Sequence, residues 1–377
     1  MSEPHSAPGD AESGFGRYVR ERLGAVPFAP DPERFEELAF AASLASFTDL
    51  ARWAQGMRNE QSEALSFEVG YIERLSPDAF ADRQDGVHLI GMNQGLLATI
   101  QEFALYVFTQ SAMFPQIGDA AGEDSPPPQF GAAPGIFLLE RTLRGEPVAS
   151  ATDAHRVPKD ADRHVAAVYL AMLMTRFVWF HELAHCVKGH VAFLKANRIA
   201  APIGEIPIAL VGLRQPSIPP DQLRTLLHGF EREADATALM ACCQVQLAEA
   251  ENIAGIKALD LTTRLEMTLL AAYLMAWLFD VYQHFTDSFH DRTHPFPRTR
   301  LHHLVAHAHT LLLPELDGFP AFHAGIITRF NDLAGQIAGM HRIDDHAVQA
   351  ASVATGAELD ALLAPFRFAP VISQTED

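Results

Sequence analysis

The sequence predicts an α+β fold that is mainly helical, with a small sheet in the N-terminal third and a helical C-terminal part. Short segments that read as strands fall before residue 160. Beyond that residue, apolar-rich segments of helical length follow one another. The hydrophobic content of 48% and the charged content of 20% are those of a globular protein. We expect the sheet to pack on the helix predicted over 162–196.

The elements are predicted in order from local patterns. Residues 1–14, rich in Ser, Pro, Gly and acidic residues, are expected to form a disordered tail. Asn93 is placed to cap the helix that follows it. Strands are predicted at 66–72, 87–92 and 135–140. Helices are predicted at 31–57, 94–110, 162–196, 221–251, 259–285, 298–313, 321–340 and 358–363.

Two connections are candidates for gating a site. The segment 115–134 is rich in Pro, Gly and acidic residues and is longer than an ordinary connection, so we expect it to be disordered or to act as a lid. The segment 200–220 combines prolines with apolar residues. It is expected either to pack as an ordinary loop or to cover a cleft.

Charge and cysteine content argue against several classes of protein. The net charge is −19 and no Lys/Arg cluster occurs, which disfavours binding to nucleic acid or to an anionic membrane. Three cysteines are too few for a disulfide scaffold and favour a reducing compartment. No signal peptide is expected, and the longest apolar run, 267–279, is shorter than the ~20 residues of a membrane span. We expect a cytoplasmic protein without a transmembrane span; its oligomeric state is not indicated.

The motif His181-Glu182-Leu183-Ala184-His185 lies in the helix predicted over 162–196. Residues four apart share one helical face, so both imidazoles can bind one metal ion. Glu182 can reach a water molecule on that ion, as the general base does in H-E-x-x-H metalloproteases. The apolar residues before the motif predict a buried helix, in which polar side chains need partners. The alternative is a chance match, with both histidines hydrogen-bonded in a core.

The third metal ligand is predicted on the next long helix, because a catalytic zinc ion usually has three protein ligands. Glu231 and Asp235 are four residues apart and share a face. We predict that Glu231 completes a His2Glu site and that Asp235 accepts the N–H of a ligating histidine. Glu233 points to another face, where a solvated or salt-bridged side chain is expected. On a continuous helix, His190 would lie away from the metal face, so we expect it at a helix end or on the surface.

Segments 181–185 and 231–235 together resemble the H-E-x-x-H and E-x-x-A-D motifs of the gluzincin metallopeptidases. The most similar branch is that of the HtpX-type and CAAX-prenyl endoproteases. Its members often carry a Thr-His-Pro followed by an Arg, and the sequence has these at 293–295 and Arg300. Members of that branch are commonly membrane-embedded, and residues 1–160 match nothing in it. The general plan is also similar to that of soluble phage-exclusion peptidases of the Lit type and of repressor-cleaving ImmA-like proteins.

This resemblance implies a metallopeptidase domain over 15–377. We divide it into an N-terminal α/β part (15–160), a zinc-binding catalytic core (161–313) and a helical C-terminal part (314–377). The Thr-His-Pro block implies that His294 donates a hydrogen bond to the oxyanion of the reaction. Arg300 is expected to anchor the same loop through a salt bridge.

The expected function is that of a zinc-dependent endopeptidase with a protein or peptide substrate. One Zn²⁺ held by His181, His185 and Glu231 would activate a water molecule, and Glu182 would act as general base. The alternative is a catalytically silent metal-binding or sensor protein that acts through a protein partner. The presence of Glu182 favours the enzyme, because a structural zinc ion has no use for a base.

Two further features are expected to be structural. His303 and His307 have helical spacing, but no carboxylate accompanies them, so a solvated face is favoured over a second metal site. Cys186 lies beside His185 but points off the metal face, where a buried small apolar side chain is expected.

Overall fold

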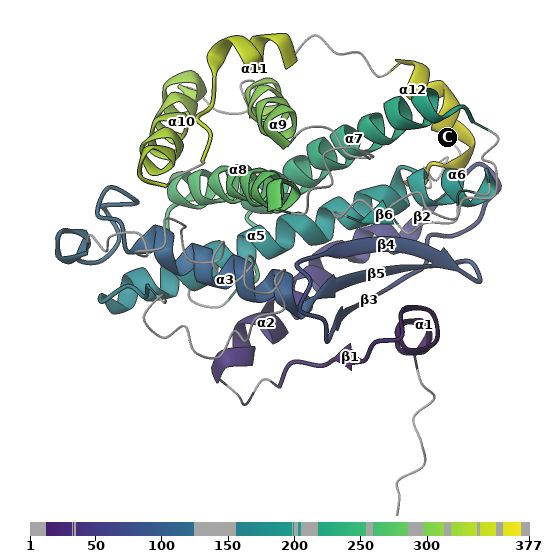
Figure 1. Ribbon diagram of the computed structural model, residues 1–377, viewed down its shortest axis with the longest axis horizontal. Helices are drawn as coiled ribbons and strands as arrows, with labels where there is room; N and C mark the ends of the chain where they lie inside the picture. The colour runs from purple at the N-terminus through teal and green to yellow at the C-terminus, as the bar shows by residue number, and fades with distance from the viewer. Residues whose placement is uncertain are drawn as a thin grey trace, which may run out of the picture.

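The computed structural model confirms the predicted α+β class over the residues that it describes (Figure 1). The sheet lies between helix α1 (Gly14–Leu23) on one face and the long helix α5 (Ala161–Val187) on the other, and the C-terminal helices pack beyond α5 (Figure 1). Of the predicted tail, residues 1–12 lie outside the described part. The described residues are 13–31, 33, 35–123, 156–197, 199, 203–204, 218–253, 259–285, 297–312, 318–337, 340–351 and 357–370.

The larger sheet has five strands among the described residues, in the order β1-β3-β5-β4-β6. β3 and β5 are parallel, whereas the other neighbours are antiparallel. The predicted strands at 66–72 and 87–92 are confirmed as β3 and β5, and the predicted strand at 135–140 lies outside the described residues. The five strands are β1 (Pro27–Phe28), β3 (Phe67–Ile72), β4 (Ala79–Gln84), β5 (Val87–Asn93) and β6 (Ile203–Gly204).

Strand β4 is absent from the predicted elements. It forms a hairpin with β5 through a two-residue turn in which Asp85 and Gly86 have φ values of 52° and 85°. Two successive positive φ values match the twist of hairpin strands, and Asp-Gly is among the strongest signals for this turn. The sequence therefore carries a local signal for β4 that the apolar pattern alone does not reveal.

The two faces of the sheet are covered by different helices. Phe15 and Val19 of α1 pack against Phe80 on one face. On the same side, the hydroxyl of Tyr18 donates a hydrogen bond to Asp82 at 2.7 Å. The opposite face contacts α5 through β4 and β5, which confirms that the sheet packs on the motif helix.

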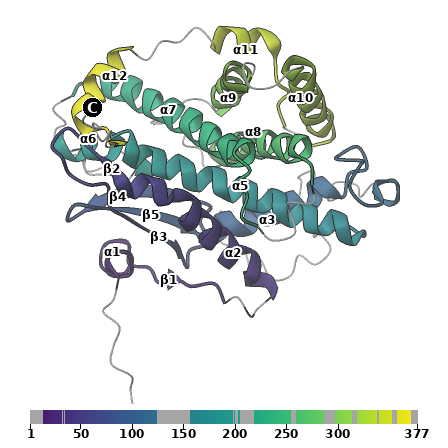
Figure 2. The ribbon, with the colours of Figure 1, turned by 180° about the vertical axis from the view of Figure 1, so that it is seen from behind.

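Helix α5 is the centre of the molecule. Helices α2 (Phe35–Leu50) and α3 (Gln94–Phe108) lie on its two sides, as the opposite views in Figures 1 and 2 show. Helices α7 (Pro220–Leu247) and α8 (Leu261–Phe285) cover it on the side away from the sheet. A helix that is apolar on all sides can be buried on all sides, and α5 is buried along nearly its whole length.

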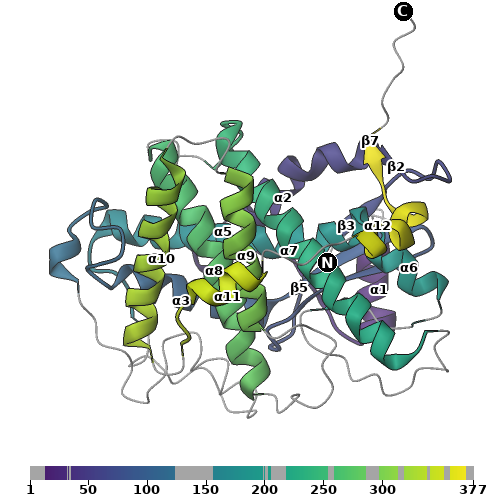
Figure 3. The same ribbon diagram turned by 90° about the horizontal axis from the view of Figure 1, so that it is seen from above.

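The remaining C-terminal helices form an outer layer on α7 and α8, seen from above in Figure 3. The chain then returns to the N-terminal part, because β7 pairs with β2 in a second, two-stranded sheet. Helices α1 and α11 are absent from the predicted helices, whereas those predicted at 94–110, 221–251, 259–285, 298–313, 321–340 and 358–363 are confirmed. The remaining elements are η1 (Ala51–Gly56), β2 (Met57–Arg58), η2 (Ala120–Gly122), α6 (His190–Ala196), α9 (Pro297–Leu312), α10 (Phe319–Gln336), α11 (Asp345–Ala351), α12 (Ala357–Leu363), η5 (Ala364–Phe366) and β7 (Ala369–Pro370).

The helix predicted over 162–196 is in fact two helices, so its continuity is a wrong prediction. Helix α5 ends at Val187, and α6 begins at His190 after Gly189, whose φ is 81°. A left-handed residue cannot continue an α-helix, and glycine adopts this conformation without steric strain.

Among the described helices, none combines the length and the apolar character needed to cross a membrane.

The start of the predicted loop 115–134 is ordered against α5. The guanidinium of Arg163 is completely buried and donates hydrogen bonds to five backbone carbonyls, those of Phe108, Gln110, Met113, Phe114 and Ile117, at 2.9–3.1 Å. Residues 115–123 are therefore held against the core, with Ile117, Ala120 and Glu123 buried, and the rest of this loop lies outside the described residues.

A second buried arginine ties α5 to the end of α7. Both terminal nitrogens of Arg176 donate to Glu251, one to each carboxylate oxygen, at 2.8 Å. Tyr169 and Gln246 donate to Glu251 at 2.7 Å and 2.9 Å, and Arg176 also donates to Ser46 of α2 at 3.0 Å. Because each charge is paired and hydrogen-bonded, this network can lie inside the core.

Substitution of Glu251 with glutamine should destabilise the protein by about 3–5 kcal/mol, because the buried charge of Arg176 loses its partner. Chemical unfolding followed by circular dichroism would measure this loss. The matched control is Glu63→Gln, which removes the partner of Arg83 in an exposed pair and should change stability by about 0–1 kcal/mol. Equal effects of the two substitutions would contradict the importance of the buried network.

The same carboxylate should make stability sensitive to acid. Burial alone would raise the pKa of Glu251, but the hydrogen bonds and charge of Arg176 outweigh it and lower the pKa to about 2 from its ordinary 4.5. Glu251 therefore stabilises the fold fully above pH ~4.5, and this contribution disappears as the pH falls towards 2. Over that range the wild type should lose about 3 kcal/mol more than Glu251→Gln does. Parallel stability–pH curves for the two proteins would refute this.

Candidate metal centre

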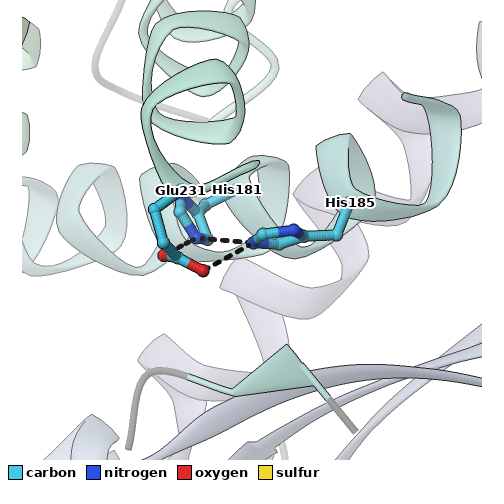
Figure 4. A group of neighbouring side chains, drawn as sticks. All are labelled: His181, His185 and Glu231. Atoms are coloured by element: carbon cyan, nitrogen blue, oxygen red, sulfur yellow. Dashed lines mark hydrogen bonds and ion pairs between the residues drawn. The ribbon is translucent and has the colours of Figure 1, made fainter. Parts of the chain in front are cut away.

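His181, His185 and Glu231 converge at the contact between α5 and α7 (Figure 4). The Nε2 atoms of the two histidines are 3.0 Å apart. The carboxylate oxygens of Glu231 lie 3.3 Å from His181 Nε2 and 3.6 Å from His185 Nε2. All three side chains are buried, with exposed fractions of 0–3%. The sequence-predicted ligand set is thus assembled in space.

The spacing of these donor atoms suits a small divalent cation. A tetrahedral ion with bonds of about 2.0–2.1 Å holds its ligands ~3.3 Å apart, and the three separations here are 3.0–3.6 Å. Two imidazoles and a carboxylate are also the donor types found in catalytic zinc sites. Within the described part of the chain, no other group of three or more His, Cys, Asp or Glu side chains meets this spacing.

Asp235 orients the first histidine, as the sequence predicts. Its Oδ1 lies 3.0 Å from Nδ1 of His181, on the side of the ring away from the other ligands. Burial raises the pKa of Asp235, but the charge of Arg300 and the hydrogen bond with His181 outweigh it, so the pKa lies below its usual range. Asp235 is therefore ionised and accepts the N–H of His181, which leaves Nε2 as a lone-pair donor.

Arg300 holds Asp235 and faces the ligand carboxylate as well. Its Nε and Nη2 donate to the two oxygens of Asp235 at 2.8 Å and 2.7 Å, and its Nη1 lies 3.7 Å from Glu231. The guanidinium also lies over the ring of Phe279, 5.1 Å from its centre. The expected salt bridge of Arg300 is thus present, and its partner is Asp235 of the candidate metal centre. His294, the predicted oxyanion donor, lies outside the described residues.

Glu182 lies in the same buried turn as His181, with an exposed fraction of 1%. It is the residue that follows the first ligand, so its position is set by the same helix that sets the imidazole. Cys186, one turn further on, is fully buried and its thiol contacts the backbone carbonyl of Glu182 at 3.4 Å. Burial raises the pKa of Cys186 well above its usual range, so it is a neutral, apolar side chain as expected.

His190 is buried against the site, so its predicted place at a helix end or on the surface needs correction. It starts α6, as expected for a helix end, but its exposed fraction is 0% and its Nδ1 lies 2.9 Å from Nδ1 of His185. The reason is the break at Gly189, which turns the chain and brings the next residue back beside the motif. Burial lowers the pKa of His190, and Glu233 offsets this only in part. The ring is therefore neutral at neutral pH.

Glu233 is salt-bridged, which is one of the two states, solvated or salt-bridged, that the sequence predicts for it. It lies 3.1 Å from Nε2 of His190, 2.8 Å from Nη2 of Arg367 and 3.5 Å from Nζ of Lys188. Burial raises its pKa, but these partners outweigh that effect and lower it. Sequence reasoning misses Arg367, and no local signal marks it, because it is 134 residues away along the chain.

His303 and His307 are not on a solvated face. They are half-buried and line a cavity of about 340 Å³ between α7, α9, α11 and α12. Burial is the main cause that lowers the pKa of both rings. The described residues do not bring a third metal-binding side chain to them.

Comparison of the chain with known proteins returned no match: no family model, no curated protein and no solved structure is significantly similar to it.

Proposed function

We propose that this protein is a zinc-dependent endopeptidase that cleaves a peptide bond at the centre formed by His181, His185 and Glu231. The observation that carries the proposal is the convergence of these three donors, within 3.0–3.6 Å, beside a glutamate that directly follows the first ligand. The resemblance of 181–185 and 231–235 to gluzincin motifs supports the same function.

Zinc is the proposed ion, because two imidazoles and a carboxylate leave a coordination position open, as in catalytic zinc sites. When bound, the ion supplies Lewis acidity, which activates a water molecule and polarises the substrate carbonyl. The burial of the three ligands keeps competing water away and strengthens their electrostatic interactions. Asp235 keeps the ring of His181 in the tautomer that a metal ligand requires.

Glu182 is the proposed general base. Its carboxylate takes a proton from the attacking water molecule and delivers it to the nitrogen of the leaving amine. A residue in this position has no role in a structural zinc site, and such sites are usually rich in cysteine. The oxyanion donor remains the prediction that the resemblance assigns to His294.

The proposed substrate is a protein or peptide. The net charge of −19 and the scarcity of basic clusters disfavour nucleic acid as a partner. The three buried free cysteines fit a reducing compartment, so the cytoplasm is the proposed place of action.

The purified protein should bind one zinc ion per chain, and Glu231→Ala should lose most of it. The substitution removes one of three ligands and the negative charge that offsets the metal. Elemental analysis after dialysis would measure the metal content. Glu266→Ala, which removes the α8 glutamate that pairs with Arg329 of α10, is the control and should keep the ion. A wild type that binds no zinc after reconstitution would contradict the proposal.

Glu182→Gln should retain the zinc ion but lose activity by about 10²–10⁴-fold, which is the usual contribution of general acid–base catalysis. Cleavage of a fluorogenic unfolded protein, such as labelled casein, would measure this loss beside the metal content of both proteins. Unchanged cleavage by the variant would refute the base assignment. Metal binding without cleavage of casein or of a peptide library would favour the silent metal-binding alternative.

A further inference from the structure

We propose that His190, Glu233 and Arg367 form a positioning chain that holds His185 in place, and that the C-terminal segment 364–370 closes it. The inference rests on the proposed metal centre and extends it to residues outside the predicted motifs. The chain runs through contacts of 2.9 Å, 3.1 Å and 2.8 Å, from His185 to His190, to Glu233 and to Arg367.

The first contact defines the tautomer of each ring. A metal ligand at Nε2 of His185 uses the lone pair there, so the proton of this ring is on Nδ1. Nδ1 of His185 therefore donates to Nδ1 of His190, 2.9 Å away. The proton of His190 must then be on Nε2, which donates to Oε2 of Glu233 at 3.1 Å. Two neutral rings and one carboxylate satisfy every donor and acceptor along this path.

His190 is fixed by its surroundings as well as by its hydrogen bonds. Its ring stacks on Phe230 of α7, with a centre-to-centre distance of 4.4 Å and an interplanar angle of 7°. Gly189 sets the direction in which His190 enters, through its φ of 81°. A side chain at Gly189 would also come within 2.6 Å of Phe366, so only glycine permits this approach.

Glu233 owes its position to the C-terminal segment. Arg367 donates to Glu233 and also pairs with Asp360 at 2.9 Å, while Nζ of Lys188 lies 3.5 Å from Oε1 of Glu233. The same carboxylate accepts the N–H of His190 Nε2 at 3.1 Å. Without Arg367, Glu233 would retain only Lys188 as a cationic partner among the described residues.

The C-terminal segment is itself anchored on α5 and α6. The backbone N–H of Phe368 donates to the carbonyl of Val187, the last residue of α5, at 2.8 Å. Phe366 packs edge-on against Phe193 of α6, with ring centres 5.7 Å apart. The pairing of β7 with β2 holds the following residues. Arg367 is thus delivered to a defined place between these contacts.

The two histidine ligands are consequently supported in parallel ways. Behind His181 stand a carboxylate and an arginine, Asp235 and Arg300. Behind His185 stand Glu233 and Arg367, but the ring of His190 lies between His185 and this pair. Such partners raise the basicity of a ligand and fix its orientation, and their loss commonly weakens metal binding by about 10–100-fold.

The test is the zinc affinity of variants, measured by competition with a chromophoric chelator. His190→Phe keeps an aromatic ring against Phe230 but removes both nitrogens, and it should weaken zinc binding by about 10–100-fold. Arg367→Met should weaken it by about tenfold, and Arg367→Lys should restore most of the affinity. Arg329→Met is the matched control, because it breaks another arginine–glutamate pair of similar exposure; it should leave the affinity unchanged.

Cobalt substitution adds a readout that a purely structural role would not move. The visible absorption bands of bound Co²⁺ should shift in His190→Phe and Arg367→Met, but not in Arg329→Met. If wild type binds one ion and both variants match it in affinity and in spectrum, the positioning chain is refuted while the metal centre stands. If wild type binds no ion, the proposed function fails, and the positioning chain fails with it. Thermal melting identifies any variant that does not fold. If His190→Phe does not fold, the zinc affinity and cobalt spectrum of Arg367→Met decide the test.

Discussion

The structure depends on one constraint: α5 is buried along nearly its whole length, yet it carries charged side chains and the two histidines of the candidate metal centre, and each of these needs a partner. Polar side chains of α5 find partners at three positions along the helix. Arg163 binds backbone carbonyls near its start, Arg176 pairs with Glu251 in its middle, and the two histidines face Glu231 at its end. The packing of α2, α3 and α7 around α5 follows from these partners as much as from apolar contacts.

Much of this arrangement can be predicted from the sequence, because it depends on local spacing. The four-residue intervals in His181–His185 and Glu231–Asp235 place each pair on one helical face, and the structure brings both pairs together. The two strands predicted at 66–72 and 87–92 likewise depend on local patterns, which are alternation in the first and an apolar segment in the second. Where a contact is determined by helix geometry, the sequence is sufficient to anticipate it.

The rest depends on changes of chain direction and on distant partners. The position of His190 follows from a single backbone angle at Gly189, which interrupts a pattern that is otherwise continuous. Arg367 reaches Glu233 only after the whole C-terminal part has folded back, and no periodicity encodes that contact. Strand β4 is an intermediate case, since Asp85-Gly86 marks its turn although its own residues do not alternate clearly.

The return of the C-terminal segment also determines the order in which the parts of the site can assemble during synthesis. During synthesis, the helix that bears both histidines and the helix that bears Glu231 leave the ribosome well before residue 367 does. The partial chain can therefore bring the candidate ligands together while one of them, His185, still lacks its complete support. The candidate centre would then gain the complete support of His185 only after residue 367 has emerged and the C-terminal segment has packed against α5 and α6.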